Sequence, residues 1–151
     1  LQGIRDMSGL ENVTVVLGAK APHLEDVRSF KAAFSCRVLS GVADMAGLMA
    51  DHDLGIGCGG MTSWERCVVG LPAVLLACAE NQVPIGRALQ EVGAGLFLGR
   101  AAQVAPLDIL AGIERLGTDR TLYHSMVDAG LRVCDGMGTE RVASALWGQR
   151  P

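Results

Sequence analysis

The stretch from Leu71 to Cys78, LPAVLLAC, constrains the fold of this chain more than any other. It is continuously apolar, without the alternation of polar and apolar residues that marks a strand with one face in water. A run of this kind is buried on both sides, which is typical of a central strand in a parallel sheet covered by helices. Pro72 is tolerated there because it lies near the start of the strand. The chain is therefore expected to be an α/β protein.

Strand-like and helix-like segments alternate along the rest of the chain. Four more strands are predicted, at residues 13–17, 36–39, 54–58 and 95–98. Helices are predicted at residues 22–34, 42–51, 63–69, 84–92, 106–116, 120–133 and 139–146. This order implies right-handed crossovers between parallel strands. It predicts a Rossmann-like, doubly wound parallel sheet with helices on both faces.

Composition narrows the classes of function. The 151 residues, half of them hydrophobic, suit one compact domain spanning 1–151. The net charge of −3 and the lack of a basic run argue against nucleic acid as the partner. The longest apolar stretch, 68–79, is shorter than the roughly 20 residues that span a membrane. No secretion signal begins the chain and Leu1 is not an initiator methionine, so we expect a fragment of a longer cytoplasmic protein.

The cysteines and histidines give no metal-binding pattern. The five cysteines are odd in number and contain no C-x-x-C pair, and three of them lie in or beside apolar runs. We expect them to be reduced thiols, mostly in the core. A zinc site needs closer pairs of ligands, and the three histidines are far apart in the sequence. No metal and no cofactor is therefore expected.

One glycine-rich segment invites a dinucleotide-binding interpretation. Residues 55–60 match G-x-G-x-x-G, and Glu80 lies twenty residues beyond Gly60. That fingerprint belongs to the turn after the first strand of a sheet, whereas Gly55 and Gly57 fall inside the third predicted strand. A dinucleotide-binding or non-enzymatic domain is therefore kept only as an alternative.

The segment from Gly59 to Glu65 is a glycine turn that leads directly into a helix. Free N–H groups at such a turn favour an anion such as phosphate. Gly59 and Gly60 let the backbone approach a ligand closely and can adopt a positive φ. Residues 62–65 also match a capping box, in which Glu65 would bond back to the Thr62 N–H. A carboxylate at this position could instead accept hydrogen bonds from the two hydroxyls of a ribose.

Asn81 and Gln82 follow the buried strand. In open parallel sheets, ligands bind where the carboxyl ends of the strands meet, so this loop is expected beside the glycine turn. Their amides suit sugar hydroxyls, although ordinary turn chemistry explains them equally. Trp64 is expected to pack against the core.

The segment GGMTSWERCVVGLPAVLLACAENQ, residues 59–82, resembles the nucleotide-binding C-terminal domain of the GT-B fold. It is most similar to the UDP-2,4-diacetamido-2,4,6-trideoxy-β-L-altropyranose hydrolases of the pseudaminic acid pathway. Weaker likeness extends through VVLGAKAPHLE and DGMGTERVASAL. The resemblance implies a UDP-sugar substrate, from which water attack releases UDP and the free diacetamido sugar. It also implies that an N-terminal domain outside this chain supplies the catalytic histidine.

A more distant likeness is to the UDP-N-acetylglucosamine transferase of peptidoglycan synthesis, which keeps a GT-B glycosyltransferase as the alternative. The two resemblances together imply a role for each residue. Glu65 would hold the ribose and the Val42 backbone the uracil, while Asn81 and Gln82 would face the sugar. Gly60, Met61 and Thr62 would bind the diphosphate, and the adjoining Gly59 and Ser63 are also expected to belong to the nucleotide-binding site. Met61 stands where the family has Ser or Thr, so only its backbone is expected to contribute, and Arg66 has no assigned role.

Overall fold

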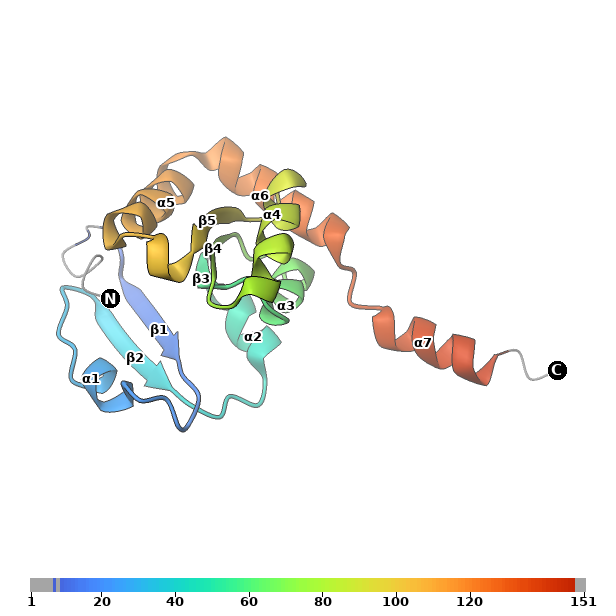
Figure 1. Ribbon diagram of the computed structural model, residues 1–151, viewed down its shortest axis with the longest axis horizontal. Helices are drawn as coiled ribbons and strands as arrows, with labels where there is room; N and C mark the ends of the chain where they lie inside the picture. Colours follow the sequence, from blue (N-terminus) through green and yellow to red (C-terminus); the bar gives the residue numbers. More distant parts are fainter. Residues whose placement is uncertain (1–6, 8, 149–151) are drawn as a thin grey trace. The chain divides into compact units, whose positions relative to one another are not determined.

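A computed structural model describes residue 7 and residues 9–148 of the chain. The chain divides into two compact units, residues 1–45 and residues 46–151 (Figure 1). Each unit is described by itself.

The first unit holds a two-stranded parallel sheet. β1 (Asn12–Val16) pairs with β2 (Ser35–Leu39) in a register that runs from Asn12 opposite Ser35 to Val16 opposite Leu39. Between them, α1 is only five residues long (Leu24–Arg28), although a helix was predicted over 22–34. None of its residues is buried. A helix without a buried face gains little from packing, which accounts for its shortness.

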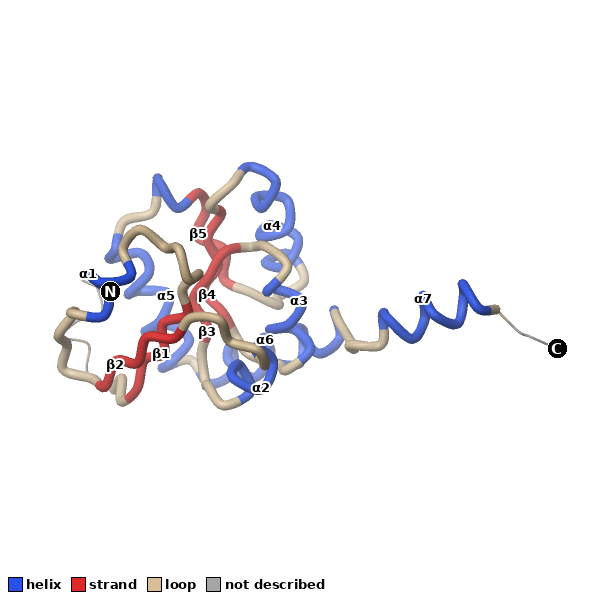
Figure 2. Tube along the Cα trace, turned by 90° about the horizontal axis from the view of Figure 1, so that it is seen from below, coloured by secondary structure: helices blue, strands red, loops and turns tan. Residues whose placement is uncertain are grey.

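The second unit holds a three-stranded parallel sheet in the order β3-β4-β5 (Figure 2). The strands are β3 (Gly55–Cys58), β4 (Ala73–Ala77) and β5 (Leu96–Arg100). β4 is central, as its unbroken apolar sequence predicts. The expected single sheet is wrong in one respect, because β1 and β2 form a sheet of their own. The α/β class with parallel strands is confirmed.

The remaining helices agree with the predicted ones to within a few residues. They are α2 (Met45–Ala50), α3 (Thr62–Val68), α4 (Val83–Glu91), α5 (Pro106–Thr118), α6 (Arg120–Val133) and α7 (Gly138–Trp147). Short 3₁₀ turns occupy Glu80–Gln82 and Ala101–Gln103. α4 and α5 each have a proline in the first helical positions, where no hydrogen-bonded N–H is lost.

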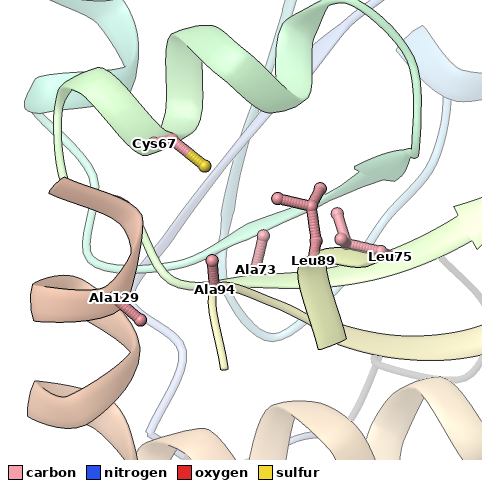
Figure 3. Packing of buried hydrophobic residues seen from close by; sticks show 6 residues of the cluster. All are labelled: Cys67, Ala73, Leu75, Leu89, Ala94 and Ala129. Atoms are coloured by element: carbon pink, nitrogen blue, oxygen red, sulfur yellow. The ribbon is translucent and has the colours of Figure 1, made fainter. Parts of the chain in front are cut away.

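Successive side chains of β4 point to opposite faces of the sheet, and helices cover both. Leu75, 1% exposed, belongs to a core cluster with Leu89 of α4 and Cys67 of α3 (Figure 3). On the other face lies Val74, which is fully buried. A Cβ added to Gly112 of α5 would lie 3.1 Å from the Val74 side chain, so α5 packs closely there. Burial on both faces explains why β4 has no polar residue.

Candidate functional site

The segment of residues 59–62, which runs from the end of β3 to the first residue of α3, has unpaired backbone N–H groups. The Gly59 N–H continues the sheet ladder by donating to the Leu76 carbonyl over 2.8 Å. The Ser63 N–H donates to the Gly60 carbonyl, and the Trp64 N–H to that of Met61. Within residues 9–148, no backbone carbonyl accepts a hydrogen bond from the N–H groups of Gly60, Met61 and Thr62. Three consecutive donors are therefore available at the carboxyl edge of the sheet.

Gly59 is required by close approach to the neighbouring loop. A Cβ at this position would lie 3.1 Å from the Gln82 carbonyl oxygen and 3.4 Å from the Gly86 nitrogen. Neither Gly59 nor Gly60 uses the positive φ that glycine allows. The absence of a Cβ at Gly59 lets this segment pack against the start of α4.

Gln82 is held in one orientation by the end of β4. Its Oε1 accepts a hydrogen bond of 2.8 Å from the Cys78 N–H. Only the oxygen of an amide can accept a hydrogen bond, so this contact fixes the orientation of the whole amide group. The position of Nε2, which is a hydrogen-bond donor, is thereby fixed as well. Nε2 lies 3.6 Å from the Cβ position of Gly60. The structure thus brings together two of the loops predicted from the sequence, although Asn81 beside Gln82 is simply exposed.

The capping box predicted for Thr62 and Glu65 is wrong. α3 begins at Thr62 itself, and Met61 before it already has helical angles of φ −57° and ψ −37°. The Thr62 side chain is therefore inside the helix, where it cannot cap, and α3 has no side-chain cap. Glu65 is exposed, and among the described residues it forms no ion pair or side-chain hydrogen bond. Its carboxylate is free for a ligand.

Ser63 and Arg66 face inward beneath the loop. Ser63 is 1% exposed and Arg66 6% exposed. Arg66 Nη2 donates to the Ser63 hydroxyl and to the Cys58 carbonyl, each over 2.9 Å. Burial lowers the pKa of the Arg66 guanidinium, against smaller opposing effects of Cys67 and Glu65. The Ser63 side chain therefore serves the interior, and Arg66 is a part of the site that the motif did not explain.

Glu80 and Arg100 pair at the same edge of the sheet. The guanidinium of Arg100 donates to both carboxylate oxygens of Glu80, over 2.7 and 2.8 Å. The hydrogen bond and charge of Arg100 lower the pKa of Glu80, and Glu80 raises that of Arg100. Both side chains are largely exposed. Glu80 is thus engaged by a cation from the end of β5.

The prediction that all the cysteines are free thiols is wrong for two of them. Cys58 and Cys78 form a disulfide across the ends of β3 and β4, with Cα atoms 6.1 Å apart. Their separation of 20 residues matches no recognisable spacing. Only the parallel pairing of β3 with β4 brings them together. Of the free cysteines, Cys67 is buried, while Cys36 and Cys134 are half-buried.

The other predicted residues are placed as follows. Trp64 packs against the core cluster, as expected. Val42 follows β2 in the first unit and is half-buried. In the part of the chain that the structure describes, no three His, Cys, Asp or Glu side chains gather where they could hold a metal ion. No described helix is long and apolar enough to cross a membrane.

Comparison with solved structures defines the fold class. MurG of Acinetobacter baumannii superposes with a TM-score of 0.80 over 97% of this chain and 44% of its own, at 19% identity. The spinosyn rhamnosyltransferase SpnG, complexed with thymidine diphosphate, gives 0.75 over 97% and 39%, at 18% identity. The chain has the Rossmann-like α/β fold of a domain of GT-B glycosyltransferases.

Comparison of sequences adds one particular relative. The chain is 29% identical over 137 residues to the spore coat polysaccharide biosynthesis protein SpsG of Bacillus subtilis (strain 168). The match covers 90% of this chain and 40% of that protein, so the chain spans about two fifths of the length of the relatives it matches. No family model matches the chain.

Proposed function

We propose that this chain is the UDP-binding half of an enzyme that acts on a nucleotide sugar. The observation that carries the proposal is the meeting of two loops at the carboxyl edge of β3 and β4. There Nε2 of Gln82 lies 3.6 Å from the position that a Cβ of Gly60 would take, at the start of the segment whose N–H groups at Gly60, Met61 and Thr62 are free. These are neutral hydrogen-bond donors, which is the chemistry that a diphosphate requires.

In this proposal, other residues bind the remaining parts of the nucleotide sugar. The free carboxylate of Glu65 accepts from the ribose hydroxyls. Asn81 lies toward the sugar, next to Gln82. Support comes from a solved neighbour that holds thymidine diphosphate and from the likeness to a polysaccharide biosynthesis protein. A dinucleotide is disfavoured because the face of Gly57 is filled by Arg66 and that of Gly55 by Arg66 together with Leu71 and Ala73.

The proposed reaction is hydrolysis of the sugar–phosphate bond, which gives UDP and a free diacetamido-trideoxy sugar as in the pseudaminic acid pathway. In this proposal the catalytic residue belongs to a further domain, in line with the match to SpsG covering only 40% of that protein. Transfer of the sugar to an acceptor is the second candidate, because several structural neighbours are glycosyltransferases. Incubating the two-domain protein with the UDP-sugar and no acceptor separates them: steady release of free sugar supports the hydrolase.

Nucleotide binding is tested on the chain itself by NMR. UDP is expected to shift the amide signals of Gly60, Met61 and Thr62, while uridine, which lacks phosphate, leaves them in place. NAD serves as the control for the dinucleotide alternative. Unchanged amide signals at millimolar UDP would rule out the proposed site.

Glu65→Gln tests the ribose contact separately. Because Glu65 caps nothing, the variant should unfold at nearly the same denaturant concentration as the natural chain. Hydrogen bonds to a charged group contribute about 1.5–3 kcal/mol, so UDP binding should weaken by roughly tenfold or more. The loss should be smaller for 2′-deoxyuridine diphosphate, which has already lost one of the hydroxyls. Equal losses for both nucleotides would place the ribose elsewhere.

A further inference from the structure

Arg66 lies beneath the β3–α3 loop as a buried cation. Its side chain is 6% exposed, and no carboxylate within residues 9–148 forms an ion pair with it. A charge removed from water destabilises the folded state unless other interactions compensate. An apolar side chain would fill the same space without that cost. The arginine is therefore expected to serve something other than packing.

A single guanidinium nitrogen joins both ends of the loop. Nη2 of Arg66 donates over 2.9 Å to the carbonyl of Cys58, the last residue of β3. The same nitrogen donates over 2.9 Å to the hydroxyl of Ser63, in the first turn of α3. Residues 59–62 are the segment between these two points. The Ser63 hydroxyl also donates to the Cys58 carbonyl over 3.5 Å, and Arg66 reinforces this link by bonding to both groups.

The first peptide unit of the loop is also held on two sides. Its carbonyl, that of Cys58, accepts from Arg66. Its N–H, that of Gly59, donates over 2.8 Å to the Leu76 carbonyl in β4. A peptide plane bonded at both its oxygen and its nitrogen cannot turn without breaking one of the bonds. The direction in which the chain enters the loop is therefore determined.

Two glycines of β3 make the space that Arg66 occupies. A Cβ on Gly57 would lie 2.9 Å from Nη1 of Arg66, and one on Gly55 would lie 3.2 Å from its Cδ. Residues two apart in a strand face the same side of the sheet, so the two glycines form one trough. Apart from the chain neighbours of Gly57, the three heavy atoms nearest to the added Cβ all belong to Arg66. The glycines that imitate a dinucleotide motif are explained by this side chain.

We propose that Arg66 is a positioning residue for diphosphate binding, seated in the Gly55–Gly57 trough, that holds residues 59–62 in the conformation which leaves their N–H groups free. The inference rests on the proposed function for its ligand, but the effect on the loop is independent of any nucleotide. Its positive charge beneath the loop also favours an anion above it.

Arg66→Met keeps an unbranched, apolar side chain, although a shorter one, and removes the hydrogen bonds of the guanidinium. Arg87→Met, at an exposed position of α4, is the matched control. Without nucleotide, amide hydrogen exchange of Gly59 should accelerate by at least about tenfold in Arg66→Met, as expected for loss of one or more charged hydrogen bonds. UDP affinity should fall by a similar factor, and uridine affinity should change less than about threefold. The control should change neither.

Gly57→Ala provides a second route should Arg66→Met fail to fold. The added methyl group displaces the guanidinium, so exchange at Gly59 should accelerate and UDP should bind more weakly. In an Arg66→Lys background the methyl group no longer meets a guanidinium, and its effect should disappear. An equal effect of Gly57→Ala in both backgrounds would overturn the proposal.

The outcomes separate this inference from the proposed function. Unchanged exchange at Gly59 in Arg66→Met overturns the positioning role, whatever UDP does. Faster exchange with unchanged UDP affinity also overturns it, because the loop would then not need Arg66 to bind. If the natural chain binds no UDP, the proposed function fails, and the exchange rate at Gly59 alone decides whether Arg66 orders the loop.

Discussion

Gly95, which precedes β5, packs against the most buried strand of the chain. A Cβ added there would lie 2.5 Å from Cδ1 and 3.2 Å from Cγ of Leu75. Carbon atoms in good contact are about 3.5–4.0 Å apart. Leu75 is 1% exposed and lies in β4 between two neighbouring strands, so it has no free volume into which to retreat. Gly95→Ala is therefore predicted to destabilise the fold.

Two opposing effects decide the magnitude. Forcing one methyl group into a packed core costs about 1–3 kcal/mol. Replacing glycine at a φ that alanine tolerates stabilises by about 0.4–1 kcal/mol, because the unfolded chain becomes less flexible. Gly95 is not among the glycines with positive φ, so that gain applies here. The net change in the free energy of unfolding is a loss of about 1–2 kcal/mol.

Urea denaturation followed by circular dichroism measures the effect. With a slope of about 2 kcal/mol per molar urea, the midpoint of Gly95→Ala should fall by about 0.5–1 M. Gly117→Ala is the control, because its added Cβ meets nothing within 4 Å and lies in helix α5. The control should be neutral or stabilised by up to about 1 kcal/mol.

A second variant tests whether Leu75 is the cause. Leu75→Ala alone should cost about 2–5 kcal/mol through the cavity it leaves. In the double variant the Gly95→Ala methyl group enters that cavity, so the two losses should not add. A Gly95→Ala protein as stable as the natural chain would refute the reasoning, as would strict additivity in the double variant.

Three further predictions concern single interactions. Arg100→Gln should raise the pKa of Glu80 to its ordinary value, as measured by NMR titration of the carboxylate. Because the pKa is lowered in the folded state, the pair stabilises the fold fully above the ordinary pKa of Glu, and this stabilisation is lost as the pH falls through the folded-state pKa. Cys58→Ser should cost about 3 kcal/mol under oxidising conditions, and a reductant should then lower the stability of the natural chain but not of the variant. Tyr123→Phe removes a hydrogen bond of 3.0 Å to the Asp53 carbonyl and should lower the free energy of unfolding by about 1 kcal/mol, measured by urea denaturation.

Much of the fold could be predicted because its signals are local. The apolar run from Leu71 to Cys78 indicates a strand buried on both sides, and β4 is the centre of its sheet. Prolines at 84 and 106 mark the starts of two helices. The helix predicted over 22–34 was too long because its pattern gave no sign that the helix would bury no residue.

The candidate site was predicted less completely. The topology of a parallel sheet predicts that the loops at Gly59 and Gln82 lie side by side, and the structure confirms this proximity. That these loops bind a ligand stays a prediction. The capping box at Thr62 failed because the first turn of α3 begins one residue earlier than its motif requires. A shift of one residue decides that geometry, and sequence patterns do not locate helix ends so finely.

The sequence by itself determined the order and kind of the elements and the central place of β4, because these depend on hydrophobic periodicity within a few residues. Only the tertiary structure decided that Arg66 fills the trough of Gly55 and Gly57, that Gln82 turns its Nε2 toward Gly60, and that the disulfide forms. The residues in each of these contacts are separated in the sequence and come within a few ångströms of one another only when the chain packs. Gly55 and Gly57, which match part of a dinucleotide-binding motif, therefore make room for a side chain of the same protein.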